Sequence, residues 1–389
     1  MSNNVIHSEK PDNYQICTKT IMDNIADPDI TFDENGICNY YYEYFEKHKK
    51  HVREGEEGLR IFNEKIELIK KNGKGKKYDC IIGVSGGVDS TYLAYLAKEN
   101  NLRALLVHFD NGWDSELAVK NIENLVNILG FDLYSLVVNW EEFKELQLAY
   151  FRSSVIDIEM PSDHAILGTM YKLAAKHKVK YFLSGFNIVT EGILPSAWNF
   201  DKFDAVNMKD IYKKHGNGLK LSSYPFFGLA EKKKYVSYSG VQSAVLLNYI
   251  DYNKAKVKEL IQEKLGWVDY GGKHYESIFT RFYQGYILPR KFNIDKRKAH
   301  LSTLVCSNQI TREEALEELA QDIYPPELLA RDKEFVLKKL GFTEQEFEAV
   351  MNLPIKSHYD YATGKHSVYE VYPFLKIIKP IVSLWTKRK

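Results

Sequence analysis

Apolar runs that alternate with helix-like stretches constrain the fold of this chain more than any other feature. Runs of strand length occur at YDCIIGV (78–84), RALLVHF (103–109), DLYSLVV (132–138) and YFLSG (181–185). Continuously apolar strands of this kind are typical of parallel sheets that helices cover on both faces. The alternation therefore predicts an α/β fold, a doubly wound and mostly parallel sheet with right-handed crossovers.

Changes of pattern divide the chain into three expected parts. Residues 1–74 form an N-terminal extension, in which an irregular segment precedes a charged helix over about 41–71. Residues 75–250 hold the α/β domain, and residues 251–389 form a helical C-terminal region that closes the active site. In that region Thr311/Glu314 and Thr343/Glu346 have the spacing of helix capping boxes.

Charge and composition narrow the class of function. The chain has 53 Lys and Arg against 52 Asp and Glu, whereas dedicated nucleic-acid binders are usually strongly basic. No apolar run approaches the roughly 20 residues that a membrane span needs. The start of the chain lacks the apolar core of a signal peptide, and four cysteines in 389 residues are too few for a disulfide scaffold. We expect a cytoplasmic protein with no nucleic-acid partner and no membrane span.

The segment SGGVDS lies between the first apolar run and the helix that follows it. It comprises Ser85, Gly86, Gly87, Val88, Asp89 and Ser90. Adjacent glycines permit a tight turn, and the N–H groups at the start of a helix bind phosphate oxygens. The serine hydroxyls add donors, and the Asp carboxylate is a suitable ligand for magnesium between phosphates. A glycine turn that only joins strand to helix is the alternative, but it requires neither the Asp nor the serines.

This loop differs from the nucleoside-triphosphatase loop GxxxxGK[ST]. It resembles the pyrophosphate loop of the ATP pyrophosphatases, a superfamily that includes GMP, NAD and asparagine synthetases and tRNA-thiolating enzymes. The resemblance covers roughly residues 78–200. It implies ATP and Mg²⁺ as cofactors and cleavage of ATP between its α and β phosphates. Members typically adenylate a carbonyl or amide oxygen, which a nitrogen or sulfur nucleophile then displaces.

Two later segments resemble nucleotide-binding parts of the same superfamily, namely VHFDNGW (107–113) and SGFNIVTEG (184–192). Each follows an apolar run, and ligands of open α/β sheets bind at the carboxyl ends of the strands. The resemblance assigns four further residues to ATP: Phe109, Asp110, Gly185 and Asn187. It also makes Glu191 a magnesium ligand beside Asp89. Either segment alone is equally consistent with an ordinary polar strand end.

Basic and aromatic residues alternate over residues 271–302. The stretch fits a solvated helix face, an RNA-binding surface or a set of cations that close over pyrophosphate and an anionic substrate. We favour the last interpretation. Lys273 and Arg281 of this stretch then have catalytic roles together with Asp89 of the SGGVDS loop. The substrate-binding residues are Arg290, Lys291 and Arg297.

Over most of its length the chain resembles the N-acetyl sugar amidotransferases of bacterial surface-polysaccharide and flagellar-glycan synthesis. The resemblance spans about residues 17–361 and rests on CTKTIMDNIADPDITFDENGICN, SGGVDS, MPSDHAI, KHYESIFTRFYQGYILPRKF, IDKRKAHLS and NLPIKSHYDY. It implies conversion of a sugar acetamido group to an acetamidino group with ATP and ammonia, and the sugar is expected to be nucleotide-linked. It also places Asp163 and His164 near the substrate, although an Asp at a helix start is usually a cap.

The ammonia is expected to come from another chain. None of the four cysteines lies in the G-x-C-x-G setting of a class I glutaminase, and Ser2 after Met1 excludes an N-terminal nucleophile. We expect a class I glutaminase and a cyclase-like channelling protein as partners, both resembling subunits of imidazole-glycerol-phosphate synthase.

The cysteines near the N-terminus depart from the family pattern. The family usually has two C-x-x-C pairs there, a tetrahedral zinc pattern. Here Thr20 and Tyr41 stand three residues after Cys17 and Cys38, where the second cysteine of each pair would lie. We therefore expect no zinc.

Two other functions remain open. One is a tRNA-modifying enzyme of the same superfamily, acting by thiolation or amine ligation, and the other is a non-catalytic nucleotide-binding scaffold of a glycan-assembly complex.

Overall fold

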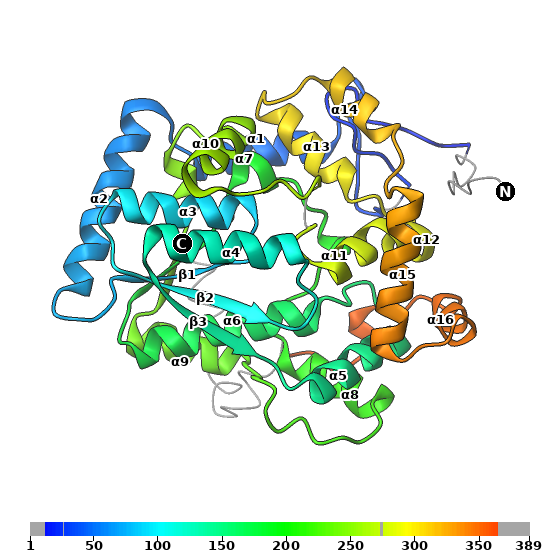
Figure 1. Ribbon diagram of the computed structural model, residues 1–389. Coiled ribbons are helices and arrows are strands. Elements are labelled where there is room, and N and C mark those ends of the chain that lie inside the picture. Colours follow the sequence, from blue (N-terminus) through cyan, green and yellow to red (C-terminus); the bar gives the residue numbers. More distant parts are fainter. Residues whose placement is uncertain (1–11, 26, 273–274, 365–389) are drawn as a thin grey trace, which may run out of the picture.

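A five-stranded parallel sheet forms the centre of the molecule (Figure 1). The computed structural model describes residues 12–25, 27–272 and 275–364. The strand order is β3-β2-β1-β4-β5. The strands are β1 (Cys80–Gly83), β2 (Ala104–Asp110), β3 (Asp132–Val137), β4 (Tyr181–Leu183) and β5 (Gln242–Ala244). The predicted α/β class is confirmed, and β1, which precedes the SGGVDS loop, is the central strand.

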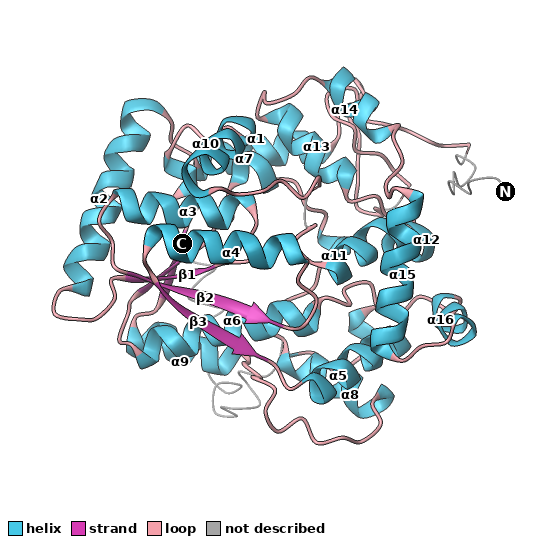
Figure 2. Ribbon diagram, viewed as in Figure 1, coloured by secondary structure: helices cyan, strands magenta, loops and turns pink. Residues whose placement is uncertain are grey.

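Helices account for most of the remaining chain (Figure 2). They are α1 (Asn39–His51), α2 (Gly55–Gly73), α3 (Val88–Glu99), α4 (Glu116–Leu129), α5 (Trp140–Ser153), α6 (Met160–Lys176), α7 (Ile188–Glu191), α8 (Ala205–His215), α9 (Leu229–Ser239), α10 (Lys254–Leu265), α11 (Ile278–Phe282), α12 (Leu288–Phe292), α13 (Arg297–Cys306), α14 (Arg312–Leu319), α15 (Pro326–Leu340) and α16 (Glu344–Met351). A π-helical turn (Tyr283–Ile287) joins α11 to α12.

Helices cover both faces of the sheet, α3 and α4 on one and α6 and α9 on the other (Figure 1). In β2, Leu106 packs in the same buried cluster as Leu125 of α4, whereas Leu105 packs with Met170 of α6. Successive side chains of a strand point to opposite faces. A strand covered on both sides therefore needs an unbroken apolar run, which is what the sequence has.

Two details of the predicted organisation are wrong. The charged stretch over 41–71 is not one helix but two, because the chain leaves helical geometry after His51 and Gly55 has a φ of +60°. The sheet also has a fifth strand that apolar runs did not indicate. This strand, β5, is only three residues long with the sequence QSA, and as an edge strand it lacks the apolar run of a buried one.

The predicted helix starts are confirmed. Thr311 and Thr343 each accept from the backbone N–H three residues on, and Glu314 and Glu346 return the bond to complete the capping boxes. None of the helices in the described ranges combines the length and the apolar character that crossing a bilayer requires.

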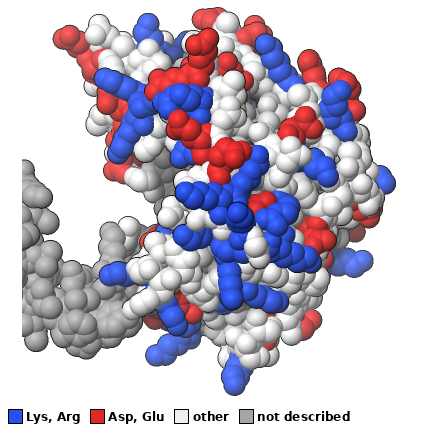
Figure 3. Space-filling model, turned by 90° about the vertical axis from the view of Figure 1, so that its left-hand side faces the viewer, with Lys and Arg blue, Asp and Glu red and all other residues white. Residues whose placement is uncertain are grey.

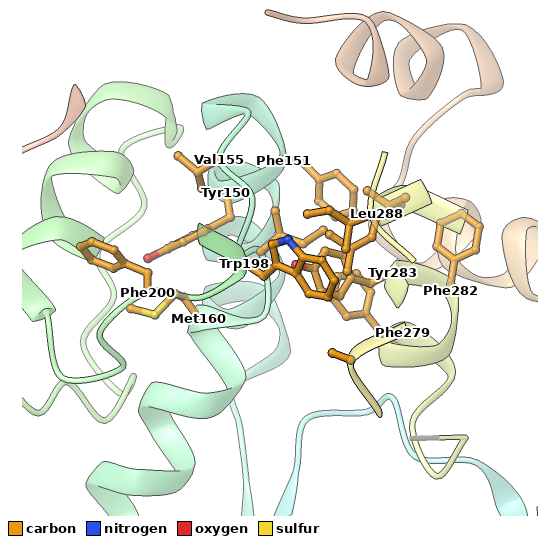
Figure 4. Close-up of a cluster of buried hydrophobic side chains, with 14 of the residues drawn as sticks. Tyr150, Phe151, Val155, Met160, Trp198, Phe200, Phe279, Phe282, Tyr283 and Leu288 are labelled. Carbon is orange, nitrogen blue, oxygen red and sulfur yellow. The ribbon is translucent and has the colours of Figure 1, made fainter. Parts of the chain in front are cut away.

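A large buried cluster joins the C-terminal helices to the α/β part of the chain (Figure 4). Phe151 of α5 packs against Phe279 of α11 with ring centroids 6.0 Å apart, and Phe347 of α16 lies 6.3 Å from the same Phe151 ring. The C-terminal region therefore shares a core with the sheet domain, and this shared core fixes its position relative to the carboxyl ends of the strands.

Lys and Arg side chains gather near the centre of the face in Figure 3. This face is the left-hand side of Figure 1, where α2 lies and the strands begin. It is the end of the sheet opposite to the SGGVDS loop, which follows the carboxyl end of β1.

Candidate nucleotide-binding site

The SGGVDS loop makes a left-handed turn immediately before α3. Gly86 has a φ of +77°, and a Cβ atom there would lie 2.6 Å from the carbonyl oxygen of Ala118. Glycine is therefore required on both conformational and steric grounds. Gly87 precedes the first residue of α3, and its N–H donates to Ser85 Oγ at 3.3 Å, while Ser90 Oγ donates to the Gly87 carbonyl at 3.3 Å. Backbone N–H groups at such a helix start suit an anion.

Asp89 meets two residues from distant parts of the chain. Its Oδ1 accepts from Asn187 Nδ2 at 3.3 Å and from the hydroxyl of Tyr252. Gly185 packs against the same turn, since a Cβ there would lie 3.2 Å from the backbone nitrogen of Ser90. The structure thus brings the loop together with the 184–192 segment. The binding of ATP by these residues stays a prediction.

Glu191 lies at the end of α7, close enough to influence the same hydroxyl. Burial raises the pKa of Tyr252 well above its usual range, and the charges of Asp89 and Glu191 raise it further. Tyr252 is therefore a neutral hydrogen-bond donor to Asp89 that also feels the charge of Glu191. Carboxylates in this arrangement suit a divalent cation.

The two residues expected at the end of β2 lie in different surroundings. Phe109 is buried and packs against Phe143 with ring centroids 6.3 Å apart, so its ring belongs to the hydrophobic core. Asp110 accepts from the Gly112 N–H at 2.9 Å and lines a cavity of about 420 Å³ with His108. The contact of either residue with a nucleotide stays a prediction.

A segment from the C-terminal region runs across the loop. We call residues 267–272 and 275–278 the strap. Trp267 Nε1 donates to the Gly86 carbonyl at 2.8 Å. The carbonyl of Glu276 accepts from the Ser115 N–H at 2.8 Å, and the Ile278 N–H donates to the Trp113 carbonyl at 2.8 Å. The strap therefore ties the SGGVDS loop to the segment that follows β2.

The strap places an acidic and a phenolic side chain over the loop. A Cβ atom on Gly87 would lie 3.5 Å from both Glu276 Oε1 and Tyr270 Oη. Burial raises the pKa of Tyr270 above its usual range, as do the charges of Glu276 and Asp89. The interpretation of the sequence missed Glu276 because it rested on the basic residues of the stretch 271–302, and it missed Trp267 and Tyr270 because they precede that stretch.

The basic residues predicted to close over the anion have partners within the C-terminal region. Arg281 is buried, and its Nη2 lies 2.6 Å from Asp332 Oδ2. Arg290 Nη1 donates to Glu348 Oε1 at 2.8 Å. Lys291 and Arg297 donate to backbone carbonyls of later segments, and Lys273 lies outside the described residues. These contacts favour structural roles for the arginines, and anion binding by any of the set stays a prediction.

Asp163 and His164 lie in the first turns of α6, which begins at Met160 and not at Asp163 as expected. Asp163 Oδ2 lies 3.0 Å from Lys202 Nζ. His164 is buried, with Nδ1 2.8 Å from the Lys202 carbonyl, and its Nε2 accepts from the Phe227 N–H at 2.8 Å. His164 is therefore neutral and carries its proton on Nδ1.

We expect the fold to lose stability between pH 6.5 and pH 5 because of two buried histidines. Burial lowers the pKa of His164 and of His358 to about 4. The unfolded chain binds these protons at higher pH, so stability that is present above pH 6.5 is lost as the pH falls toward 4. The expected loss by pH 5 is about 2 kcal/mol for each histidine.

Urea unfolding at both pH values measures this loss, and His164→Gln should show a smaller one. An unfolding free energy that is equal at pH 6.5 and pH 5 would contradict the prediction.

The N-terminal cysteines form a buried pair. Cys17 Sγ accepts from the backbone N–H groups of Thr20 at 3.4 Å and Cys38 at 3.2 Å. The hydrogen bond between the two side chains lowers the pKa of Cys17, because the Cys38 thiol donates to it. The same hydrogen bond raises the pKa of Cys38. Within the part of the chain that the structure describes, no three His, Cys, Asp or Glu side chains come together as a metal site.

A family match covers the C-terminal region. Residues 276–376 match the family described as LPS biosynthesis protein WbpG-like, C-terminal domain. The match begins at Glu276, in the strap. It relates most of the C-terminal region to proteins of lipopolysaccharide biosynthesis.

A curated relative matches over a shorter share of the chain. Identity to the tRNA-specific 2-thiouridylase MnmA of Clostridioides difficile (strain 630) is 25% over 201 residues, or 47% of this chain and 50% of that protein. The chain thus matches about half the length of this relative. The match supports the superfamily resemblance that the loop indicates.

Solved structures also match this chain. NH3-dependent NAD synthetase from Campylobacter jejuni subsp. jejuni, in complex with the nitrate ion, is 13% identical with a TM-score of 0.29 and covers 74% of this chain and 97% of that one. NMN synthetase from Francisella tularensis is 11% identical with a TM-score of 0.29, covering 56% of this chain and 98% of that one. A predicted subunit of tRNA methyltransferase from Methanocaldococcus jannaschii is 14% identical with a TM-score of 0.27. The match covers 47% of this chain and 76% of that one.

Proposed function

We propose that this protein is an ATP-dependent amidotransferase that converts the acetamido group of an N-acetylated, nucleotide-linked sugar to an acetamidino group. The observation that carries the proposal is the SGGVDS loop at the start of α3, tied to Asn187 and Tyr252 through Asp89 and crossed by the strap. The match of residues 276–376, from the last residues of the strap onward, to a lipopolysaccharide-biosynthesis family supports a sugar substrate.

The residues around the loop suit magnesium-bound phosphates. Asp89 and Glu191 act on the same hydroxyl, and Glu276 lies above Gly87. Carboxylates this close to the loop would repel a bound phosphate unless a cation lay between the carboxylates and the phosphate. Asp89 and Glu191 would hold Mg²⁺, which would offset charge on the phosphate oxygens. The backbone N–H groups of the loop hold the polyphosphate in place.

The proposed reaction proceeds in two steps. The acetamido oxygen attacks the α-phosphorus of ATP, pyrophosphate leaves, and an O-adenylated imidate forms. Ammonia then attacks the imidate carbon, AMP leaves with the original oxygen, and loss of a proton gives the amidine. No side chain of the protein forms a covalent bond in either step. The chain's own contribution is to position the reactants and stabilise charge.

A separate glutaminase, with a cyclase-like protein as conduit, is proposed as the ammonia source. The four cysteines Cys17, Cys38, Cys80 and Cys306 are all buried. Burial raises the pKa of Cys80 and Cys306, which disfavours their thiolates as nucleophiles. The pKa of Cys17 is lowered, but its sulfur is fully buried and accepts hydrogen bonds from the backbone N–H groups of Thr20 and Cys38. This environment supports a synthetase subunit that receives ammonia and does not release it from glutamine.

Release of AMP and pyrophosphate tests the proposal. The protein is incubated with ATP, Mg²⁺ and ammonium in the presence of nucleotide-linked N-acetylated sugars or bulk tRNA. Sugar-dependent AMP formation, together with a product in which NH replaces the acetamido oxygen by mass spectrometry, is the expected result. AMP formation with tRNA alone would replace the proposal with a tRNA-modifying enzyme, which the similarity to the thiouridylase favours as second candidate. ATP binding with no turnover, even after addition of a glutaminase, would favour the scaffold.

A further inference from the structure

His108 lies where β2 meets the two segments around the SGGVDS loop. It is the fifth residue of β2, and 8% of its surface is exposed. Its Nδ1 is 3.3 Å from the carbonyl oxygen of Val84, which directly precedes the loop. Its Nε2 is 3.3 Å from Asp114 Oδ2. One imidazole ring therefore bridges the end of the central strand and the segment after β2.

Both partners of the ring are hydrogen-bond acceptors. A carbonyl oxygen and an ionised carboxylate have no proton to donate, so each contact favours an N–H on the ring nitrogen that faces it. A neutral imidazole carries one N–H, and an imidazolium carries two. The geometry around His108 therefore matches the protonated ring.

The charges nearest to the ring favour the same state. Burial by itself lowers the pKa of His108, but the hydrogen bond and the charge of Asp114 oppose it. The Val84 carbonyl and the charge of Asp110 add to that opposition, and the net effect raises the pKa above its ordinary value of 6.5.

Helices α4 and α15 contribute further charged groups near this cavity. Glu123 of α4 lines the same cavity as His108. Lys339 of α15 donates to the Gly112 carbonyl and interacts with the charges of Asp110 and Asp114. Burial lowers the pKa of Lys339. Asp110 and Asp114 therefore have both Lys339 and His108 as counter-charges, whereas Glu123 lies 3.7 Å from Lys120 of its own helix.

The carboxylate that binds His108 is joined to the strap. Asp114 forms an antiparallel bridge with Ser277, and the Ser115 N–H donates to the Glu276 carbonyl at 2.8 Å. At its other end the strap reaches the loop through Trp267 and Gly86. His108 thus contacts the residue before the loop directly, and through Asp114 it meets residues 275–278 of the strap.

We propose that His108 is a positioning residue of the ATP site, an imidazolium that joins the end of β1 to the strap through Asp114. Loss of its proton removes the ion pair with Asp114 and a positive charge beside the phosphate-binding loop. The strap is then held less firmly over the loop, and ATP binds less tightly. This inference rests on the proposed function for the identity of its ligand.

The sign of the pH dependence follows from the raised pKa. The contribution of His108 to ATP affinity is fully present below pH 6.5 and is lost as the pH rises through the pKa of the folded state. Above that pKa the dissociation constant of ATP rises by up to about tenfold per pH unit, until the neutral form determines the affinity.

Calorimetric titration of the full chain with ATP and Mg²⁺ from pH 6 to pH 9 measures this dependence. His108→Gln should bind ATP more weakly at pH 6. In a plot of the ATP dissociation constant against pH, it should also lose the break, which is the pH at which the constant of the wild type begins to rise. Asp114→Asn should keep a break but move it to lower pH, because burial then dominates the pKa of His108. A role limited to folding would not move the break.

His177→Gln is the matched control. His177 follows α6 and contacts Tyr78, which precedes β1 and lies at the opposite end of the sheet from the loop. It should keep the wild-type profile. Because a phosphate group of ATP also titrates near pH 6, the difference between His177→Gln and His108→Gln is the quantity to compare.

Histidine resonances of the ¹³C-labelled wild-type protein provide a second readout that needs no ATP. The signal absent from His108→Gln should titrate with a pKa above 6.5. A neutral His108 at pH 6, or ATP affinities of wild type and His108→Gln that change with pH in parallel, would overturn the inference alone. Failure of every variant to bind ATP would overturn the proposed function, and with it the ligand assigned here.

Discussion

Asp89→Asn is expected to lower ATP-dependent AMP release by about 100-fold or more, the scale of losing one electrostatic contact to a transferring phosphoryl group. The amide oxygen of Asn can still accept from Asn187 and Tyr252, the two partners of the Asp89 carboxylate. The loop should therefore stay folded while the charge that would hold a cation beside the phosphates is removed. Pyrophosphate release at saturating ATP and a thermal melt measure the two effects separately.

Tyr252→Phe is the matched control, because it removes a hydrogen bond to Asp89 and keeps the charge. We expect its AMP release to fall by less than about tenfold, as for loss of a single hydrogen bond. If Tyr252→Phe were as damaging as Asp89→Asn, the position of the carboxylate and not its charge would be the decisive property. Near wild-type turnover by Asp89→Asn would show that Asp89 holds no catalytic cation.

The parts of the fold that local patterns determine could be predicted from sequence. The strands β1, β2 and β4 have apolar runs because both faces of the sheet are covered, and the capping boxes at Thr311 and Thr343 use residues three apart. β5 could not be predicted, since three residues at a sheet edge give no apolar run. The break before Gly55 was missed because helical periodicity continues on both sides of it.

The site could be predicted only where its residues are contiguous. The SGGVDS loop is a local motif, and the structure places it at a helix start, as expected. The contacts that complete its surroundings join it to Tyr252 and Trp267, which are 163 and 181 residues from their partners. No spacing rule reports such contacts. Composition also cannot distinguish a cation that meets an anionic ligand from one that meets a carboxylate of the same chain, such as Asp332.

Arg281 provides the second large effect, on stability. Its guanidinium donates to Asp332 and Tyr324, and both members of the ion pair are buried. Arg281→Met should lower the free energy of unfolding by about 3–5 kcal/mol, because it leaves the Asp332 carboxylate buried without its counter-charge. Urea unfolding measures the loss.

The double variant Arg281→Met/Asp332→Leu separates a structural role from a catalytic one. Removing both charges should restore most of the stability, since an apolar pair of similar volume often replaces a buried ion pair at little cost. We expect AMP release to return with stability, because the guanidinium is 7% exposed and its hydrogen bonds go to Asp332, Tyr324 and the Tyr275 carbonyl. A double variant that is stable but releases no AMP would instead show that Arg281 contacts the substrate, as the basic stretch first indicated.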